Sequence, residues 1–145
     1  MRVTSTFDHQ VSPDELHLLA REKTPSVERI INFAEREIFR LVGQHNEENV
    51  YIELSHIQQI YAANKHVYCY AEGKEYLLNE RLYQLIARLP QSFVQISRSE
   101  LVQLAFIERF KFTKNGIIEI QFKDGQKTSV SRRYFQRIKE VLNHV

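Results

Sequence analysis

The sequence predicts a mainly β protein of the α+β class, in which an N-terminal strand and an amphipathic helix precede a β module with two helices. Two observations lead to this prediction. Near residue 50 the spacing of apolar residues changes from the helical period of about 3.6 residues to the alternation typical of strands. Three of the four glycines stand in Glu-Gly, Asn-Gly or Asp-Gly pairs between strand-like runs, where hairpin turns need positive φ angles. We therefore expect antiparallel hairpins in the C-terminal part of the chain.

The N-terminal part is predicted to contain a short strand and one helix. Residues 2–7 alternate and are rich in β-branched side chains, which favours a strand. Thr24 and Pro25 form a helix start, with Thr24 as the N-cap and Pro25 at the first helical position. Apolar residues then recur on one helix face: Val27, Ile30, Ile31, Ala34, Ile38 and Leu41. We expect the helix to end near Gly43 and residues 44–49 to form a linker.

The linker divides the chain into an N-terminal extension, residues 1–47, and a β module, residues 48–145. Alternating or β-branched runs predict strands at residues 50–54, 57–62, 67–71, 74–78, 93–96, 106–111, 117–122 and 127–130. Apolar residues at helical spacing predict two helices in the module, at residues 82–89 and 134–142. Ser131 is placed to cap the second of these helices.

Charge is distributed unevenly, although the whole chain has a formal net charge of only +2. Residues 1–50 carry six Lys and Arg against nine Asp and Glu. Residues 91–145 carry ten Lys and Arg against five Asp and Glu. A basic C-terminal part is typical of a protein that binds a polyanion such as nucleic acid. An ordinary solvent-exposed surface can also have a charge imbalance of this size.

The composition disfavours a secreted or membrane-spanning protein. Cys69 is the only cysteine, so it cannot form a disulfide within the chain, which indicates a reducing compartment and a small core residue. The N-terminus is polar where a signal peptide needs an apolar core. No apolar run approaches the roughly 18–20 residues of a membrane span. We therefore expect a soluble, cytoplasmic protein.

No pattern in the sequence favours an enzyme. The six histidines are scattered, and none has the paired helical spacing of a zinc site. No two glycines are close enough to build a phosphate-binding loop, and the Gly-x-Ser-x-Gly pattern of many hydrolases is missing. We therefore expect neither catalysis, nor a cofactor, nor a metal site, nor a small-molecule substrate.

Two arginine motifs with neighbouring serines stand at the ends of predicted elements: Ser97-Arg98-Ser99 and Ser131-Arg132-Arg133. An arginine fork holds a phosphate, or the O6 and N7 edge of guanine, with two hydrogen bonds. Arg132 and Arg133 are adjacent, so both cannot pack inward, and they precede a helix whose free N–H groups favour an anion. The two motifs therefore make DNA binding the leading interpretation.

A third polar site is expected in the loop between two predicted strands, at Asn64, Lys65 and His66. Considered one at a time, each arginine, lysine or histidine of the three sites is more commonly an exposed turn residue that contacts only water. Four further lysines can add contacts to a phosphate backbone: Lys111, Lys114, Lys123 and Lys127.

These segments resemble the LytTR family of bacterial DNA-binding domains over about residues 51–145. The most specific part is residues 93–102, where a phenylalanine is followed by an arginine between two serines and then by an apolar pair. Further motifs continue in the family's order: Ile107-Glu108, Asp124-Gly125, Val130-Ser131-Arg132-Arg133-Tyr134 and Ile138-Lys139. Several motifs at consistent separations are much more specific than any one of them.

The resemblance implies short antiparallel sheets stacked along an elongated module, whose loops enter successive major grooves of duplex DNA and bend it. It places base contacts at Lys65 or His66, at Arg98 together with Ser97, and at Arg133. Asparagine is common at position 98 of the family, so Arg98 is expected to read a different base. The same resemblance gives a phosphate-facing role to Ser99, Ser131 and Arg132.

The chain departs from the commonest members of that family, which carry a phosphorylated receiver domain of more than a hundred residues. Only about 48 residues precede the module, so Asp8 and Asp14 are poor candidates for phosphorylation. The resemblance is instead to small regulators without a receiver, some of which are restrained by a membrane protein. The apolar stripe of the N-terminal helix is equally suited to dimerisation, to such a partner, or to packing on its own sheet.

We therefore expect a sequence-specific regulator of transcription that binds double-stranded DNA as a homodimer. The alternative is a protein-interaction module whose basic face is incidental. A third interpretation, an RNA binder, requires aromatic side chains displayed on an open sheet, and the alternating Tyr68 and Tyr70 permit it.

Overall fold

A computed structural model describes residues 1–12, 15–38 and 40–143, with side chains for all of these except residues 36–38 and 143. Asp14 and the side chain of Ile38, on which parts of the sequence predictions fell, lie outside the described residues. The chain divides into two compact units, Met1–Phe39 and Arg40–Val145.

In its described residues the N-terminal unit contains one helix, α1 (Pro25–Ile38). Its predicted start is confirmed, because Thr24 Oγ1 accepts a hydrogen bond from the N–H of Val27 at 3.2 Å. The Thr24 carbonyl also accepts one from the N–H of Glu28 at 2.9 Å. Ile30 and Phe33 on this helix are 41% and 62% exposed.

The strand expected at residues 2–7 is wrong, since these residues are exposed and have no regular secondary structure. A strand needs a neighbour that completes its backbone hydrogen bonds, and neither sheet of the described structure includes this segment. Its β-branched side chains are therefore not enough to make it a strand.

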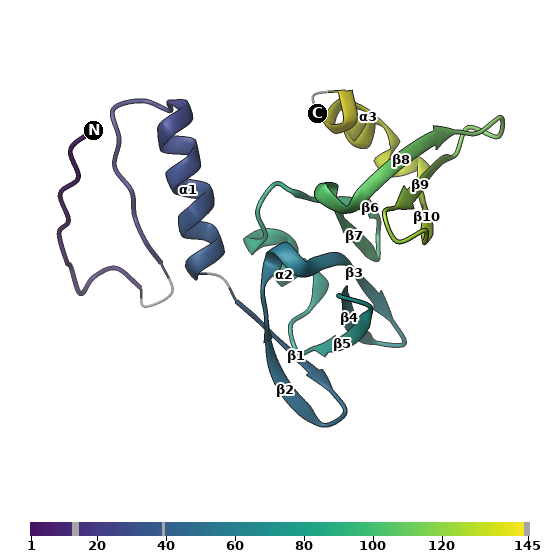
Figure 1. Ribbon diagram of the computed structural model, residues 1–145, viewed down its shortest axis with the longest axis horizontal. Helices are drawn as coiled ribbons and strands as arrows, with labels where there is room; N and C mark the ends of the chain where they lie inside the picture. Colours follow the sequence, from purple (N-terminus) through teal and green to yellow (C-terminus); the bar gives the residue numbers. More distant parts are fainter. Residues whose placement is uncertain (13–14, 39, 144–145) are drawn as a thin grey trace. The chain divides into compact units, whose positions relative to one another are not determined.

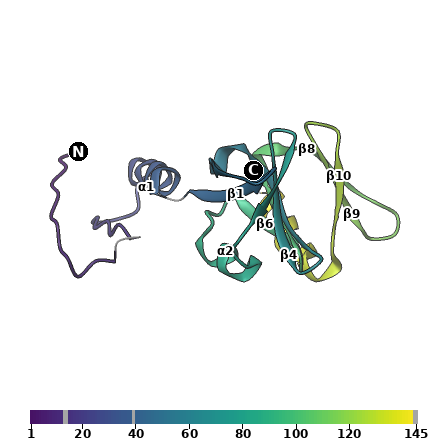
Figure 2. The ribbon, with the colours of Figure 1, turned by 90° about the horizontal axis from the view of Figure 1, so that it is seen from below.

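The C-terminal unit contains one seven-stranded and one three-stranded sheet, antiparallel in every pair (Figures 1 and 2). The larger sheet has the order β2-β1-β5-β4-β3-β7-β6 and comprises β1 (Leu41–His45), β2 (Glu48–Ile52), β3 (Ile57–Ala63), β4 (His66–Ala71), β5 (Lys74–Leu78), β6 (Phe93–Ser97) and β7 (Glu100–Gln103). The smaller sheet has the order β10-β9-β8 and comprises β8 (Ile107–Phe112), β9 (Ile118–Phe122) and β10 (Lys127–Val130).

Two helices complete the described part of this unit, α2 (Leu82–Arg88) and α3 (Phe135–Asn143). Single-turn 3-10 segments connect other elements: η1 (Leu54–His56), η2 (Leu104–Phe106) and η3 (Arg132–Tyr134). The mainly β fold with two helices in the module is therefore confirmed. None of the helices in the described residues is both long and apolar enough to cross a membrane.

An apolar core joins the smaller sheet to the edge of the larger one. Its buried side chains come from β6, β7, β9, β10 and α3: Val94, Ile96, Val102, Ile118, Ile120, Phe122, Val130 and Ile138. At the other side of β7 the buried Gln103 amide donates to the carbonyls of Leu54 and Ile57 at 2.8 and 2.5 Å. These contacts fix β6 and β7, at the edge of the larger sheet, against the smaller sheet, and the candidate site begins there.

The helix expected to end near Gly43 and the linker expected at residues 44–49 are both wrong, because these residues form the β1–β2 hairpin. Asn46 and Glu47 turn the chain with φ angles of 50° and 66°. Asparagine tolerates this left-handed conformation, but glutamate rarely adopts it, so the sequence lacked the usual glycine signal. The compact unit accordingly starts at Arg40, ahead of the boundary expected at residues 47–48.

Candidate nucleic-acid interface

The first predicted site is a tight turn between β3 and β4. Ala63 pairs with His66, so only Asn64 and Lys65 form the loop, with φ angles of 51° and 66°. This is the geometry of a two-residue hairpin turn that follows the twist of its strands. The turn holds Lys65 and His66 exposed at the end of the hairpin.

The second site is the turn between β6 and β7. Ser97 pairs with Glu100, which leaves Arg98 and Ser99 as the loop. The N–H of Ser99 donates to Ser97 Oγ at 3.2 Å, so the first serine stabilises the turn. Arg98 and Ser99 are exposed, whereas Ser97 is half-buried.

The third site follows β10. Ser131 is extended, with φ −65° and ψ 143°, and the N–H of Tyr134 donates to its carbonyl at 2.9 Å. This bond forms η3, which exposes Arg132 and Arg133 one turn ahead of α3. The expected capping role of Ser131 is wrong, because its side chain makes no cap hydrogen bond and a 3-10 turn separates it from the α-helix.

Backbone hydrogen bonds tie the second and third loops to the strands that carry the first and second loops. The N–H of Ala62, near the end of β3, donates to the carbonyl of Ser99 in the second loop at 2.8 Å. The N–H of Ser131, in the third loop, donates to the carbonyl of Ile96 at 2.8 Å. Since Tyr61 also pairs with Glu100, the three loops lie at the same end of neighbouring strands.

The cations of these loops have no carboxylate partner within the part of the chain that the structure describes. The ion pairs found there use other cations: His17, Lys23, His56, Arg88, Arg109 and Lys127. Lys65, Arg98 and Arg133 are thus exposed, unneutralised and carried on one end of the fold. Such an end attracts a polyanion.

Glu100 is the acidic residue that stands directly behind these loops. Its carboxylate accepts hydrogen bonds from Gln59 Nε2 at 3.3 Å and from Thr128 Oγ1 at 3.0 Å. It therefore links β7 to β3 and to β10, across the two sheets. Burial raises the pKa of the Glu100 carboxyl, and the Thr128 bond opposes that rise.

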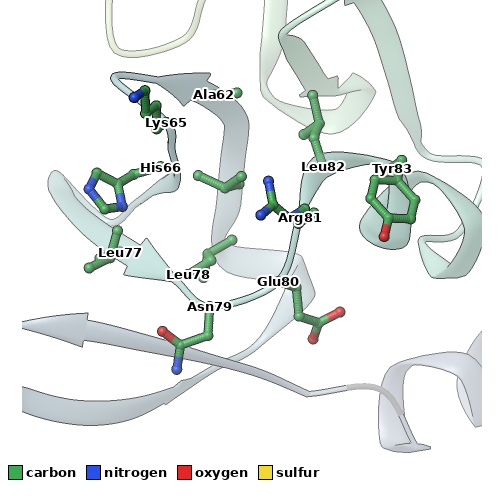
Figure 3. Close-up of a pocket in the computed structure, with 11 residues that line it drawn as sticks. Ala62, Lys65, His66, Leu77, Leu78, Asn79, Glu80, Arg81, Leu82 and Tyr83 are labelled. Carbon is green, nitrogen blue, oxygen red and sulfur yellow. The ribbon is translucent and has the colours of Figure 1, made fainter.

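Sequence reasoning missed Arg81, which lies beside the first loop in space. Arg81 and Lys65 line the same hollow, whose volume is about 500 Å³ (Figure 3). The hollow lies between the β3–β4 turn, the end of β5 and the start of α2. An exposed arginine just before a helix pattern is common, so nothing local in the sequence marks it.

Other candidate chemistry has less support in the structure. Cys69 is fully buried, in agreement with a core role. Tyr68 stacks on Tyr61 with ring centroids 5.8 Å apart and is half-buried, which limits its use as a platform for a base. Among the described residues, no group of three or more His, Cys, Asp or Glu side chains is arranged to hold a metal ion.

The family model for the LytTr DNA-binding domain matches residues 47–143. The chain belongs to the LytTR family. A Staphylococcus aureus relative (strain NCTC 8325 / PS 47), an uncharacterized HTH-type transcriptional regulator, is 38% identical over 103 residues, which cover 71% of this chain and 70% of the relative. The corresponding regulator of S. aureus strain MRSA252 is 37% identical over the same length.

A solved LytTr DNA-binding domain from Bacillus cereus supports the fold of the LytTR module. It matches with a TM-score of 0.68 at 19% identity, covering 71% of this chain and 95% of that domain. The relatives are named after the helix-turn-helix, but α2 and α3 of this LytTR module are separated by five strands. The exposed cations described above therefore lie on strand-connecting loops and a 3-10 turn, not on a recognition helix.

Proposed function

We propose that this chain is a transcriptional regulator that binds double-stranded DNA sequence-specifically through its three connected loops. In this proposal the loops enter successive major grooves. Arg98 and Arg133 each contact a base edge, and Lys65 or His66 supplies the third contact. Ser97, Ser99, Ser131 and Arg132 hold the neighbouring sugar-phosphate backbone.

The backbone bonds from Ala62 to Ser99 and from Ser131 to Ile96 are the observation that carries this proposal. They hold three short, basic loops in fixed relation before DNA arrives, so that binding does not have to order them. The absence of carboxylate partners for these cations, among the described residues, adds support. Rigid loops with free guanidinium groups are suited to reading bases rather than to non-specific attraction alone.

Replacing Arg133 by alanine tests the base-reading role. We expect Arg133→Ala to weaken binding to the cognate site by about 1–3 kcal/mol and to relax the preference at one base position. The cognate site is first obtained by selecting bound fragments from the host genome. Binding is then measured by fluorescence anisotropy on that fragment and on its single-base variants.

Arg40→Ala is the matched control, because it removes the same charge elsewhere in the unit. Arg40 precedes β1, and its guanidinium lies over the Tyr51 ring at 5.8 Å from the centroid. We expect this variant to keep the base preferences of the parent. Parent-like affinity and base preference of Arg133→Ala would show that Arg133 does not read a base.

We also propose that two copies bind repeated half-sites, and that α1 serves the dimer or a membrane-bound inhibitory partner. The exposed Ile30 and Phe33 on α1 support a contact with another protein. Sedimentation of the full chain with and without cognate DNA distinguishes a stable dimer from a dimer that forms only on DNA. A single copy per site at saturation would contradict the dimer.

The same exposed apolar residues of α1 favour a second candidate, a protein-interaction module with an incidental basic face. The two candidates differ in DNA binding. Titration of genomic fragments at two salt concentrations should show saturable binding with a clear preference among fragments if the first proposal is right. Weak binding without preference would favour the interaction module.

A further inference from the structure

The hollow beside the first loop brings two cations together from separate parts of the chain. Lys65 comes from the β3–β4 turn, and Arg81 comes from the segment between β5 and α2. In Figure 3 the Arg81 guanidinium points into the hollow from the side opposite His66. Both cations are exposed, so a ligand can reach them without any rearrangement of the fold.

Glu80 is the one acidic side chain among the described residues that line this hollow, and it does not neutralise Arg81. Its carboxylate bonds to Arg88 Nη1 at 2.8 Å. In Figure 3 the Glu80 side chain is directed away from the Arg81 guanidinium. The hollow therefore keeps a positive charge, which suits an anionic group.

The strand pairing connects the hollow to the first loop. Val67 at the start of β4 pairs with Leu78 at the end of β5. The segment that follows β5 must therefore leave the sheet beside the β3–β4 turn, and Arg81 lies on that segment. A duplex that meets Lys65 or His66 consequently passes close to Arg81.

We propose that Arg81 binds a backbone phosphate of the DNA duplex in this hollow and sets the position of the duplex beside the first loop. This proposal rests on the proposed function. Arginine holds a phosphate through a planar fork of donors, and a phosphate contact fixes register without reading sequence. Arg81 thus acts as a positioning residue for the base contact of Lys65 or His66.

A duplex phosphate fits this site better than a free anion. The polar side chains at the rim of the hollow are exposed, including Lys65, Asn79, Arg81 and Tyr83. Water and salt screen exposed charges, so a single small anion would be held weakly. A phosphate that belongs to an already docked duplex binds at a high effective concentration, and a weak site then suffices.

The test compares Arg81→Gln with the matched variant Arg40→Gln on the selected cognate fragment and on an unrelated fragment. Binding is measured by fluorescence anisotropy over a range of salt concentrations. We expect Arg81→Gln to lower the magnitude of the slope of log K against log salt by about 0.9. If the variant and the parent bind equally well in 1 M salt, this slope change makes binding of the variant about eightfold weaker than that of the parent in 0.1 M salt, on both fragments.

A second measurement locates the contact on the DNA. Neutral methylphosphonate linkages are placed one at a time along the cognate duplex. We expect one linkage near the first loop to weaken binding of the parent and of Arg40→Gln, but not of Arg81→Gln. Arg81→Lys keeps the charge and should retain most of the salt slope, while an unchanged thermal midpoint shows that each variant is folded.

The outcomes separate this proposal from the proposed function. If Arg81→Gln keeps the parent's salt slope while Arg133→Ala weakens cognate binding, the role of Arg81 is wrong and the proposed function stands. If Arg81→Gln changes the preference among base variants, a backbone-phosphate role is also wrong. If the parent prefers no fragment, the proposed function itself fails.

Discussion

Glu100 shows how one residue couples the stability of the LytTR module to pH. Burial raises the pKa of its carboxyl, so the folded state holds the proton more tightly than the unfolded chain does. The free energy of unfolding is therefore highest at low pH for this group and falls as pH rises through the raised pKa. The hydrogen bonds from Gln59 and Thr128 keep the charged form in place at higher pH.

Glu100→Gln removes this titration while keeping the size of the side chain. We expect the free energy of unfolding of the variant to depend less on pH than that of the parent as pH rises above the ordinary glutamate pKa of about 4.3. Urea unfolding at several pH values measures it. Glu48→Gln, which changes an exposed residue of β2, is the control. Its free energy of unfolding should vary with pH in the same way as that of the parent. Parallel curves for the parent and Glu100→Gln would contradict the prediction.

Cys69 gives a second test at the scale of one side chain. Burial in the core raises the pKa of its thiol to about 12. Since the thiolate is the reactive form, alkylation by iodoacetamide at pH 8 should be at least about a thousandfold slower in the folded protein than in the urea-unfolded chain. The chain has one cysteine, so mass spectrometry reports this site alone. Rapid labelling of the folded protein would mean that β4 is not packed as described.

The loop cations could be singled out from the sequence because their neighbours are distinctive, such as the serines on both sides of Arg98. Arg81 could not be found in this way, because its relation to Lys65 depends on a strand pairing. That pairing, Val67 with Leu78, joins residues whose neighbours show no common motif. A site that combines distant segments cannot be predicted from the spacing of residues in the sequence until the order of the strands in the sheet is known.

The β1–β2 hairpin depends on the absence of a side chain at Gly43. A Cβ added there would meet the Tyr76 Cβ at 2.7 Å and would also collide with the Ile52 Cδ1. The Tyr76 contact involves an atom next to the backbone, which cannot move away without shifting β5. Glycine is thus needed at this position for close packing and not for a turn.

Gly43→Ala should lower the free energy of unfolding by about 1–3 kcal/mol, because the added methyl overpacks the site. Chemical unfolding followed by circular dichroism measures the change. Gly116→Ser is a useful contrast, since a Cβ there has open space around it but the residue has a φ of 74°. Its cost should come from backbone strain alone. A neutral Gly43→Ala would show that β1 is free to move away from Tyr76.

Most strands of the LytTR module were predictable because alternation and glycine turns agree with each other, as in the β4–β5 hairpin around Gly73. The β1–β2 hairpin was missed because Glu47 takes a left-handed conformation that is rare for glutamate, so the sequence at this turn contains no glycine signal. The short β7, residues 100–103, was not singled out, since three of its four residues in a row are buried and the strand therefore lacks the alternation used to predict strands. The opposite error was the strand predicted at residues 2–7. That prediction rested on the strand propensity of β-branched residues alone, and no neighbouring strand pairs with this segment in the described structure.

The Arg40–Val145 unit contains its own apolar core, so it is expected to fold without the N-terminal residues. We predict that a truncated protein of residues 40–145 unfolds cooperatively and prefers the same genomic DNA fragments as the full chain. If α1 serves the dimer, sedimentation should show weaker self-association for the truncated protein than for the full chain. Loss of cooperative unfolding in the truncated protein would contradict the independence of this unit.

At the scale of the whole molecule, the sequence predicted that the basic residues gather in the C-terminal part. The expectation that three loops meet at one end of the strands came from the family resemblance and not from residue patterns, because the bonds from Ala62 to Ser99 and from Ser131 to Ile96 join main-chain atoms. Any residue type supplies a carbonyl, and all but proline supply an N–H. Such contacts leave no trace in residue identity.

This independence from residue type has an evolutionary consequence. If the proposed function holds, a mutation that exchanges Arg98 or Arg133 changes a base-contacting side chain and leaves the spacing of the loops intact, because that spacing is held by peptide groups. Under that proposal, descendants of one ancestor can acquire new operators one substitution at a time, without rebuilding the scaffold. Proline at position 62 or 131 is the replacement that this freedom excludes, since it removes the bonding N–H.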